Sequence, residues 1–255
     1  LDSAATAQKP RVVLDALRDF YATGNANVHR GVHWLSQEAT TSYDAVRAQA
    51  ARFLGAARPE EVIFAHGTTS AINLIARSWG EANVGAGDEV VVTAMEHHSN
   101  FVPWQVLCDR TGATLRVIPV DDAGALDMAA LEAALNDRTR VVAVAHVSNV
   151  LGTVNPIAEI ARLAHARGAI VVVDGAQAAP HLRIDVQALG CDFYMLSGHK
   201  MFGPTGIGLL WGRFALLDAM EPYETGGGMI GTVAVEGTTW ARVPARIEAR
   251  RPAIV

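Results

Sequence analysis

The stretch Ala169-Ile170-Val171-Val172-Val173-Asp174 decides the fold class of this chain. It is apolar without alternation until it ends on an acid, whereas a strand with one face in water alternates polar and apolar side chains. Continuously apolar strands are typical of parallel sheets whose two faces are both covered by helices. We therefore predict an α/β fold built around a mainly parallel sheet.

The rest of the chain alternates short β-branched runs with helical patterns of about ten to fifteen residues, which is typical of βαβ units. The predicted seven-stranded sheet has strands at 61–65, 89–93, 114–119, 140–146, 169–174, 192–196 and 206–211, each covered on both faces. Helices are predicted at 9–22, 35–55, 68–80, 100–112, 127–136, 156–167 and 213–219. We expect residues 1–222 to form this large domain and residues 223–255 to contain an exposed hairpin.

Composition favours a protein that binds a small metabolite. The 255 residues are 50% hydrophobic, and the net charge of -5 provides no basic surface for nucleic acid or an anionic membrane. No apolar run reaches the roughly 18 residues of a membrane-spanning helix. Cys108 and Cys191 form neither a CxxC pair nor a disulfide framework, which favours a reducing, cytoplasmic compartment.

A lysine follows the predicted strand at 192–196, within Ser197-Gly198-His199-Lys200. An ammonium at the end of a buried strand is costly unless its charge is paired or removed. A Schiff base with an aldehyde cofactor such as pyridoxal phosphate removes that cost. A surface lysine in a turn explains the tetrapeptide equally well, so the other strand ends must decide.

The acid that ends the strand at 169–174 needs a cationic partner, because a buried unpaired carboxylate is strongly disfavoured. A protonated pyridine nitrogen is such a partner for Asp174, and Gln177 follows one short turn later. The competing use of Asp174 is to bind a nucleotide ribose. That use is disfavoured because the Gly-x-Gly-x-x-Gly fingerprint, expected about 20 residues earlier, is missing.

The segment Gly67-Thr68-Thr69-Ser70 joins a predicted strand to a predicted helix. The free N–H groups of the first helical turn, the helix dipole and the hydroxyls of Thr68 and Thr69 would together bind a phosphate. An ordinary helix cap is the alternative. The segment lacks the Walker pattern, which disfavours nucleotide binding.

Two more strand ends carry polar side chains. His97 and His98 follow the strand at 89–93, and Asn149 follows the strand at 140–146. An imidazole there could cover a cofactor ring, while a core or capping role stays open for His98. Two adjacent histidines without a third ligand at a suitable spacing predict no metal site. Since open α/β sheets bind ligands at the carboxyl ends of their strands, one site explains these residues better than separate structural roles.

These motifs resemble the fold-type-I enzymes that depend on pyridoxal phosphate, and among them the class V group of Suf-type cysteine desulfurases and selenocysteine lyases. The matching motifs are Leu1-Asp2-Ser3-Ala4-Ala5, Asn27-Val28-His29-Arg30-Gly31, Gly67-Thr68-Thr69, Met95-Glu96-His97-His98-Ser99-Asn100, His146-Val147-Ser148-Asn149, Asp174-Gly175-Ala176-Gln177, Ser197-Gly198-His199-Lys200 and Glu236-Gly237-Thr238-Thr239-Trp240. The resemblance implies a fold-type-I large domain without the small C-terminal domain. It also implies pyridoxal 5'-phosphate as cofactor and the conversion of L-cysteine to L-alanine with an enzyme persulfide for iron–sulfur assembly.

The resemblance further implies roles at the cofactor ring. Lys200 would hold the cofactor as a Schiff base and later move protons, and Asp174 would pair with the pyridine nitrogen. Gln177 would bond the ring hydroxyl, and His97 would stack on the ring. These assignments make Lys200, His97 and Asp174 the expected catalytic residues.

Other matching residues would bind the phosphate and the substrate. The residues expected at the phosphate are Thr68, Thr69, Ser197 and His199. Asn149 would lie near the substrate carboxylate, and Thr238 and Thr239 would reach the phosphate of the neighbouring subunit. The implied partners are therefore a second copy of the chain in a homodimer, L-cysteine or a related amino acid, and a SufE- or SufU-like sulfur acceptor.

Two departures from the family bear on activity. The family's nucleophilic cysteine and its substrate-clamping arginine lie beyond the position where this chain stops, so we expect the cofactor-domain portion of a longer enzyme. Cys108 and Cys191 are predicted to be small buried residues rather than nucleophiles. The tail Arg246-Ile247-Glu248-Ala249-Arg250-Arg251-Pro252 differs from the family's Phe-Glu-Ala-Gly-Thr-Pro.

Several alternatives stay open at this point. A selenocysteine lyase or another class V enzyme, such as an aminotransferase, would share the cofactor site. A truncated, catalytically silent module that binds pyridoxal phosphate would lack turnover. A nucleotide-binding α/β protein has no fingerprint to support it.

Overall fold

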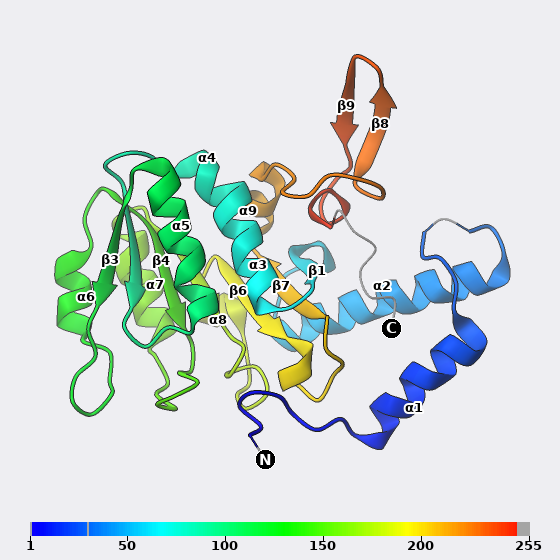
Figure 1. The fold of residues 1–255 in the computed structure, drawn as a ribbon, viewed down its shortest axis with the longest axis horizontal. Helices are drawn as coiled ribbons and strands as arrows, with labels where there is room; N and C mark the ends of the chain where they lie inside the picture. Colours follow the sequence, from blue (N-terminus) through cyan, green and yellow to red (C-terminus); the bar gives the residue numbers. More distant parts are fainter. Residues whose placement is uncertain (1, 30, 249–255) are drawn as a thin grey trace.

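The computed structural model describes residues 2–29 and 31–248. Three residues or ranges quoted above lie outside the described residues: Leu1 of segment 1–5, Arg30 of segment 27–31, and 249–252 of the tail 246–252. The described chain forms a seven-stranded sheet in the order β1-β7-β6-β5-β4-β2-β3 (Figure 1). Strands β3, β2, β4, β5 and β6 run parallel, and β7 is antiparallel to β1 and β6, which confirms the predicted mainly parallel α/β fold.

The observed strands lie within one or two residues of the predicted ones. Their bounds are β1 Val62–Ala65, β2 Glu89–Thr93, β3 Thr114–Ile118, β4 Thr139–Ala145, β5 Ile170–Asp174, β6 Phe193–Ser197 and β7 Gly208–Gly212. The helices are α1 Arg11–Asp19, α2 Trp34–Leu54, α3 Thr68–Ile75, α4 Glu81–Asn83, α5 Val102–Thr111, α6 Met128–Ala134, α7 Ile157–His165, α8 Val186–Leu189 and α9 Phe214–Ala219. The short helices α4 and α8 were not predicted, because so few residues carry no recognisable period.

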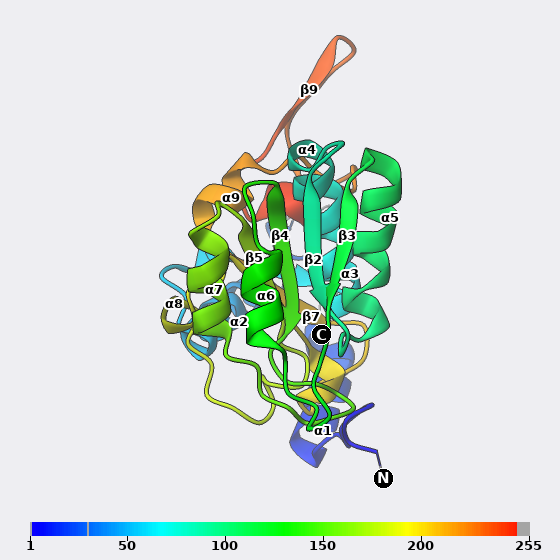
Figure 2. The ribbon, with the colours of Figure 1, turned by 90° about the vertical axis from the view of Figure 1, so that its left-hand side faces the viewer.

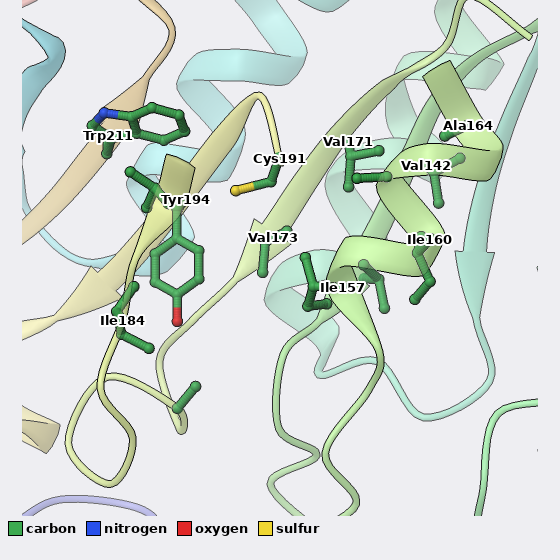
Figure 3. Packing of buried hydrophobic residues seen from close by; sticks show 14 of the residues in the cluster. Val142, Ile157, Ile160, Ala164, Val171, Val173, Ile184, Cys191, Tyr194 and Trp211 are labelled. Carbon is green, nitrogen blue, oxygen red and sulfur yellow. The ribbon is translucent and has the colours of Figure 1, made fainter. Parts of the chain in front are cut away.

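Each central strand contributes side chains to two separate cores. In β5, Val171 and Val173 point to one face, while Val172 points to the other, as the two-residue period of a strand requires. Figure 3 shows Ile157 and Ile160 of α7 beside Val171 and Val173. The fully apolar strands of the sequence are therefore explained by helices on both faces.

The second core lies on the opposite face of the sheet. Figure 2 shows α3 and α5 on one side of the sheet and α6 and α7 on the other. Ile72 and Ile75 of α3 and the fully buried Trp104 of α5 pack there against strand residues such as Val172. This two-sided packing leaves the edge at the carboxyl ends of the strands as the place where loops can form a site.

The prediction that every strand is covered on both faces is wrong for β3. Only Ile118 of this strand is buried, and Arg116 is exposed. β3 is an edge strand with one neighbour, β2, and Arg116 binds both oxygens of Glu89 across that pair at 2.7 and 2.6 Å. The apolar composition of a run does not reveal whether its strand lies at the edge or in the centre.

A buried ion pair holds the end of the described chain against the sheet. Arg47 of α2 and Glu248 have side chains that are 9% and 8% exposed, and their charged atoms lie 2.8 Å apart. Arg47 also donates to the carbonyl of Val62, and Glu248 accepts from the backbone N–H of Phe64 at 2.6 Å. The tail is thus fastened as far as Glu248 despite its departure from the family pattern.

The predicted hairpin forms and stands away from the large sheet. It consists of β8 Ile230–Ala234 and β9 Gly237–Trp240, and most of its residues are exposed (Figure 1). Val235 at its turn is fully exposed. Its contact with a second subunit and the domain division after residue 222 stay predictions.

No helix in the described ranges is both long and apolar enough to cross a membrane.

Removing one partner of the buried ion pair should destabilise the fold. We expect Arg47→Met to lower the free energy of unfolding by about 3–5 kcal/mol, because Glu248 keeps a buried charge without its cation. Urea denaturation measures this loss. The exposed Arg18, which pairs with Asp15 and Asp19, is the matched control, and Arg18→Met should change stability by less than about 1 kcal/mol. Equal losses in the two variants would contradict the role given to the buried pair.

Candidate active site at the carboxyl ends of the strands

The buried acid at the end of β5 is the centre of the candidate site. Asp174 is 6% exposed, and one of its oxygens, Oδ1, accepts a hydrogen bond from the N–H of Ala176 at 2.9 Å. Within residues 2–29 and 31–248, Oδ2 has no hydrogen-bond partner. Burial raises the pKa of Asp174, while the Ala176 N–H and the charges of Lys200 and His97 oppose that rise. The carboxyl group is therefore suited to a cationic ligand that the protein does not itself supply.

Lys200 faces the same cavity from the next strand. It ends the 3-10 turn Gly198–Lys200, which follows β6 directly. Its side chain is partly buried, and its ammonium has no hydrogen-bonded or ion-pair partner among the described residues. An amine and a carboxylate thus line one cavity, and neither forms an ion pair with another described side chain.

A third corner of the cavity is formed where β1 turns into α3. Ser197 Oγ accepts from the N–H of Thr68 at 2.9 Å and lies 2.9 Å from the hydroxyl of Thr68. Gly67 has a φ of 141°, which favours glycine, and a Cβ on Gly208 would lie 2.5 Å from the Gly67 Cα. These contacts hold the first turn of α3 against the last residue of β6 and the first residue of β7. Thr69 in this turn lines the cavity.

His97 is held by the turn that it begins. Its Nδ1 accepts from the N–H of Ser99 at 3.1 Å and lies 2.8 Å from the Ser99 hydroxyl, so the ring caps the 3-10 turn His98–Asn100. His98 does not line the cavity and borders a neighbouring groove of about 430 Å³ instead. His97 borders both the cavity and this groove, whereas His98 borders the groove alone.

The N-terminal segment forms one wall of the cavity. The sequence did not predict this position. Gln177 donates from Nε2 to the carbonyl of Ala4 at 2.8 Å, and Ala7 donates to the carbonyl of His199 at 2.9 Å. Asp2, Ala4 and Ala5 line the cavity with the strand ends. No local pattern links residues about 170 positions apart, so only the tertiary structure reveals this wall.

The structure brings most of the predicted site residues to one cavity of about 380 Å³. The predicted residues that line it are Thr68, Thr69, His97, Asn149, Asp174, Gln177, Ser197, His199 and Lys200. Thr238 and Thr239 do not line it, since they lie on β9 of the protruding hairpin. Their predicted contact is with another subunit, so it stays a prediction.

Both cysteines are buried free thiols. Burial raises the pKa of Cys108 to about 11 and that of Cys191 to about 12, which disfavours the reactive thiolate at neutral pH. The described part of the chain has no group of three His, Cys, Asp or Glu residues that could hold a metal ion. The groups at the cavity are therefore an amine, a carboxylate, an imidazole and the N-terminal end of a helix, which suits an anion.

Comparison with known proteins places this arrangement in a family. The family model described as aminotransferase class V matches residues 1–255. The chain belongs to this family. The resemblance inferred from the sequence motifs is thereby confirmed at the level of the family.

Curated and solved relatives in this family are named cysteine desulfurases. The chain is 59% identical over 253 residues to a cysteine desulfurase of Klebsiella pneumoniae, covering 99% of this chain and 62% of the relative. The apo structure of a cysteine desulfurase from Thermococcus onnurineus matches with a TM-score of 0.95 and 42% identity, covering 99% of this chain and 63% of the other. The cysteine desulfurase CsdA of Escherichia coli gives a TM-score of 0.93 at 40% identity, with coverages of 100% and 64%. The chain therefore spans a little over three fifths of these relatives.

Gly208 leaves room for the turn at Gly67, and adding a methyl group there should cost stability. A Cβ at residue 208 would lie 2.5 Å from both the Gly67 Cα and the Leu196 carbonyl oxygen, which are backbone atoms that cannot rotate away. We expect Gly208→Ala to lower the free energy of unfolding by about 1–3 kcal/mol in urea denaturation. Gly237→Ala is the control, because no atom lies within 4 Å of its added Cβ. A loss from Gly237→Ala as large as that from Gly208→Ala would show that the close approach is not the cause.

Proposed function

We propose that this chain is the cofactor-binding portion of a cysteine desulfurase that uses pyridoxal 5'-phosphate and converts L-cysteine to L-alanine, with the sulfur passed to an acceptor. The observation that carries the proposal is that the buried Asp174 and Lys200, which has no ion-pair partner among the described residues, line the same cavity. Identity of 54–59% to relatives named cysteine desulfurase or probable cysteine desulfurase, over almost the whole chain, supports the substrate class.

The residues of the cavity fit pyridoxal phosphate. Asp174 is a buried residue whose second carboxylate oxygen has no hydrogen-bond partner among the described residues, which suits a protonated ring nitrogen. Lys200 has a free amine for the aldehyde, and the first turn of α3 beside Thr69, Ser197 and His199 suits a phosphate. When bound, the cofactor supplies an electron sink for the bonds of the amino acid.

The protein's own groups then hold and move protons. Asp174 keeps the proton on the pyridine nitrogen, because separating that charge pair in a buried site is costly. Lys200 would move a proton at its Nζ. His97, fixed through Nδ1, covers the ring, while Gln177 and Asn149 offer amides to the ring hydroxyl and the substrate carboxylate.

The assembly and the partners belong to the same proposal. A homodimer would bring Thr238 and Thr239 of the exposed hairpin to the cofactor phosphate of the partner subunit. A SufE- or SufU-like protein would take the sulfur, and the free cysteines suit a cytoplasmic location.

A second candidate function is a lyase that releases sulfur or selenium without a protein thiol, such as a selenocysteine lyase. The described residues fit such a lyase, because neither Cys108 nor Cys191 among them can accept sulfur without exposing its thiol.

Cofactor attachment tests the site independently of turnover. The sequence contains two lysines, Lys9 and Lys200. After incubation with pyridoxal phosphate and reduction with borohydride, peptide mass spectrometry should find the cofactor on Lys200. Lys200→Ala should abolish the yellow colour and the adduct, whereas Lys9→Arg should retain both. An adduct on Lys9 with none on Lys200 would overturn the assignment.

Turnover of L-cysteine tests the reaction. With an added thiol as sulfur acceptor, we expect the loaded chain to form alanine from L-cysteine faster than free pyridoxal phosphate does, and Asp174→Asn to lose that excess. The unloaded Asp174→Asn protein should unfold at no lower urea concentration than the wild type, because the substitution removes a buried unpaired acid. Cofactor binding without turnover would favour the silent module, and release of elemental sulfur or selenium with alanine, without a persulfide, would favour the lyase.

A further inference from the structure

Glu96 is a partly buried acid beside the site to which no role has been given. It directly precedes His97, and its side chain bonds three different elements. Its Oε1 accepts from the hydroxyl of Thr93, at the end of β2, at 2.5 Å and from the N–H of Ala145, at the end of β4, at 3.0 Å. Its Oε2 accepts from Nδ2 of Asn100 at 2.6 Å. One carboxylate thus joins the His97 turn to two strand ends.

Asn100 has a single orientation that satisfies its neighbours. Its side-chain oxygen accepts from Nε1 of the fully buried Trp104 at 3.1 Å, so its Nδ2 must face Glu96. Asn100 itself is completely buried. The chain of bonds from Trp104 through Asn100 to Glu96 therefore has a fixed direction, with every donor pointing toward the carboxylate.

This chain of bonds crosses the turn that carries His97. The backbone N–H of Asn100 donates to the carbonyl of His97 at 2.8 Å, and the His97 ring caps the same turn. Ala145, at the other end of the chain, lies opposite Asp174 in the pairing of β4 with β5. Glu96 therefore connects His97, which is expected over the cofactor ring, with β4. This strand lies next to Asp174, the acid expected at the ring nitrogen.

Keeping a carboxylate in this place is costly. Burial raises the pKa of Glu96 to about 7, and the charge of Asp174 acts in the same direction. The bonds from Thr93, Asn100 and Ala145 oppose that rise. An apolar or amide side chain would avoid this cost, so the position calls for an explanation beyond packing.

We propose that Glu96 is a positioning residue, whose carboxylate fixes the His97 turn against the end of β4 so that the imidazole covers the cofactor ring in one pose. This inference rests on the proposed use of pyridoxal phosphate. It assigns to Glu96 no contact with the cofactor or the substrate.

The direction of the bonds makes a specific test possible. Glu96→Gln keeps the size of the side chain but places an amide donor opposite either Nδ2 of Asn100, which Trp104 prevents from turning over, or the N–H of Ala145. Asn100→Asp alone places two carboxylates face to face. The double variant Glu96→Gln with Asn100→Asp restores a donor opposite an acceptor, keeps the bond to Trp104 and returns the net charge to that of the wild type.

The experiment compares the wild type, both single variants and the double variant, in mildly alkaline buffer. Visible circular dichroism of bound pyridoxal phosphate reports the pose of the ring, and titration gives its dissociation constant. We expect each single variant to change the dichroism band and to weaken cofactor binding about tenfold, which corresponds to about 1.4 kcal/mol. The double variant should recover most of both. In the unloaded protein, the indole N–H resonance of Trp104 should shift in the single variants and return in the double variant.

Two controls separate positioning from general loss of stability. Arg47→Met destabilises the fold away from the cavity, and Glu159→Gln removes an exposed acid of an ion pair on α7. Both should leave the dichroism band unchanged.

The outcomes distinguish this inference from the proposed function. If the wild type binds no pyridoxal phosphate, the proposed function fails, and the inference fails with it. If the wild type binds the cofactor while the single variants keep the wild-type band and affinity, only the role of Glu96 is overturned. A double variant no better than the single ones would also overturn it.

Discussion

The structure depends on one constraint, the carboxylate of Asp174 held at 6% exposure at the end of a strand whose other side chains are apolar. Removing such a charge from water is unfavourable unless a cation meets it. The protein provides one hydrogen bond to it, from Ala176, and leaves Oδ2 facing the cavity. The neighbouring strand ends supply an amine, an imidazole and a helix end suited to an anion. These are the groups that a cationic ring with a phosphate would need around it.

The two cores make that site rigid. Because β5 contributes alternate valines to each face, helices on both sides hold the strand and leave its carboxyl end as the open edge. The loops at that edge are fastened by side chains. Ser197 binds the first turn of α3, and Glu96 joins the His97 turn to β2 and β4. The buried pair of Arg47 and Glu248 fastens the end of the described residues.

Tertiary structure revised several expectations from the sequence. The apolar run of β3 predicted burial on both faces, yet its place at the sheet edge leaves Arg116 exposed and bonded to Glu89. The hydroxyl of Thr68, expected at the phosphate, also contacts Ser197, which the sequence did not predict. His98 lines only the neighbouring groove, whereas His97 also lines the cavity. Each revision concerns which neighbour a side chain meets, and that depends on segments distant in the sequence.

The sequence by itself determined the order of the elements and the ends of the strands at which polar residues gather, because period and turn chemistry are local properties. It therefore identified Asp174, Lys200 and His97, and their motifs indicated the family. Only the tertiary structure decided the strand order, the N-terminal wall formed by Asp2, Ala4 and Ala5, and the bonds of Glu96. Those features join residues that can be more than 170 positions apart, and no local pattern specifies which distant partner a hydrogen bond will find.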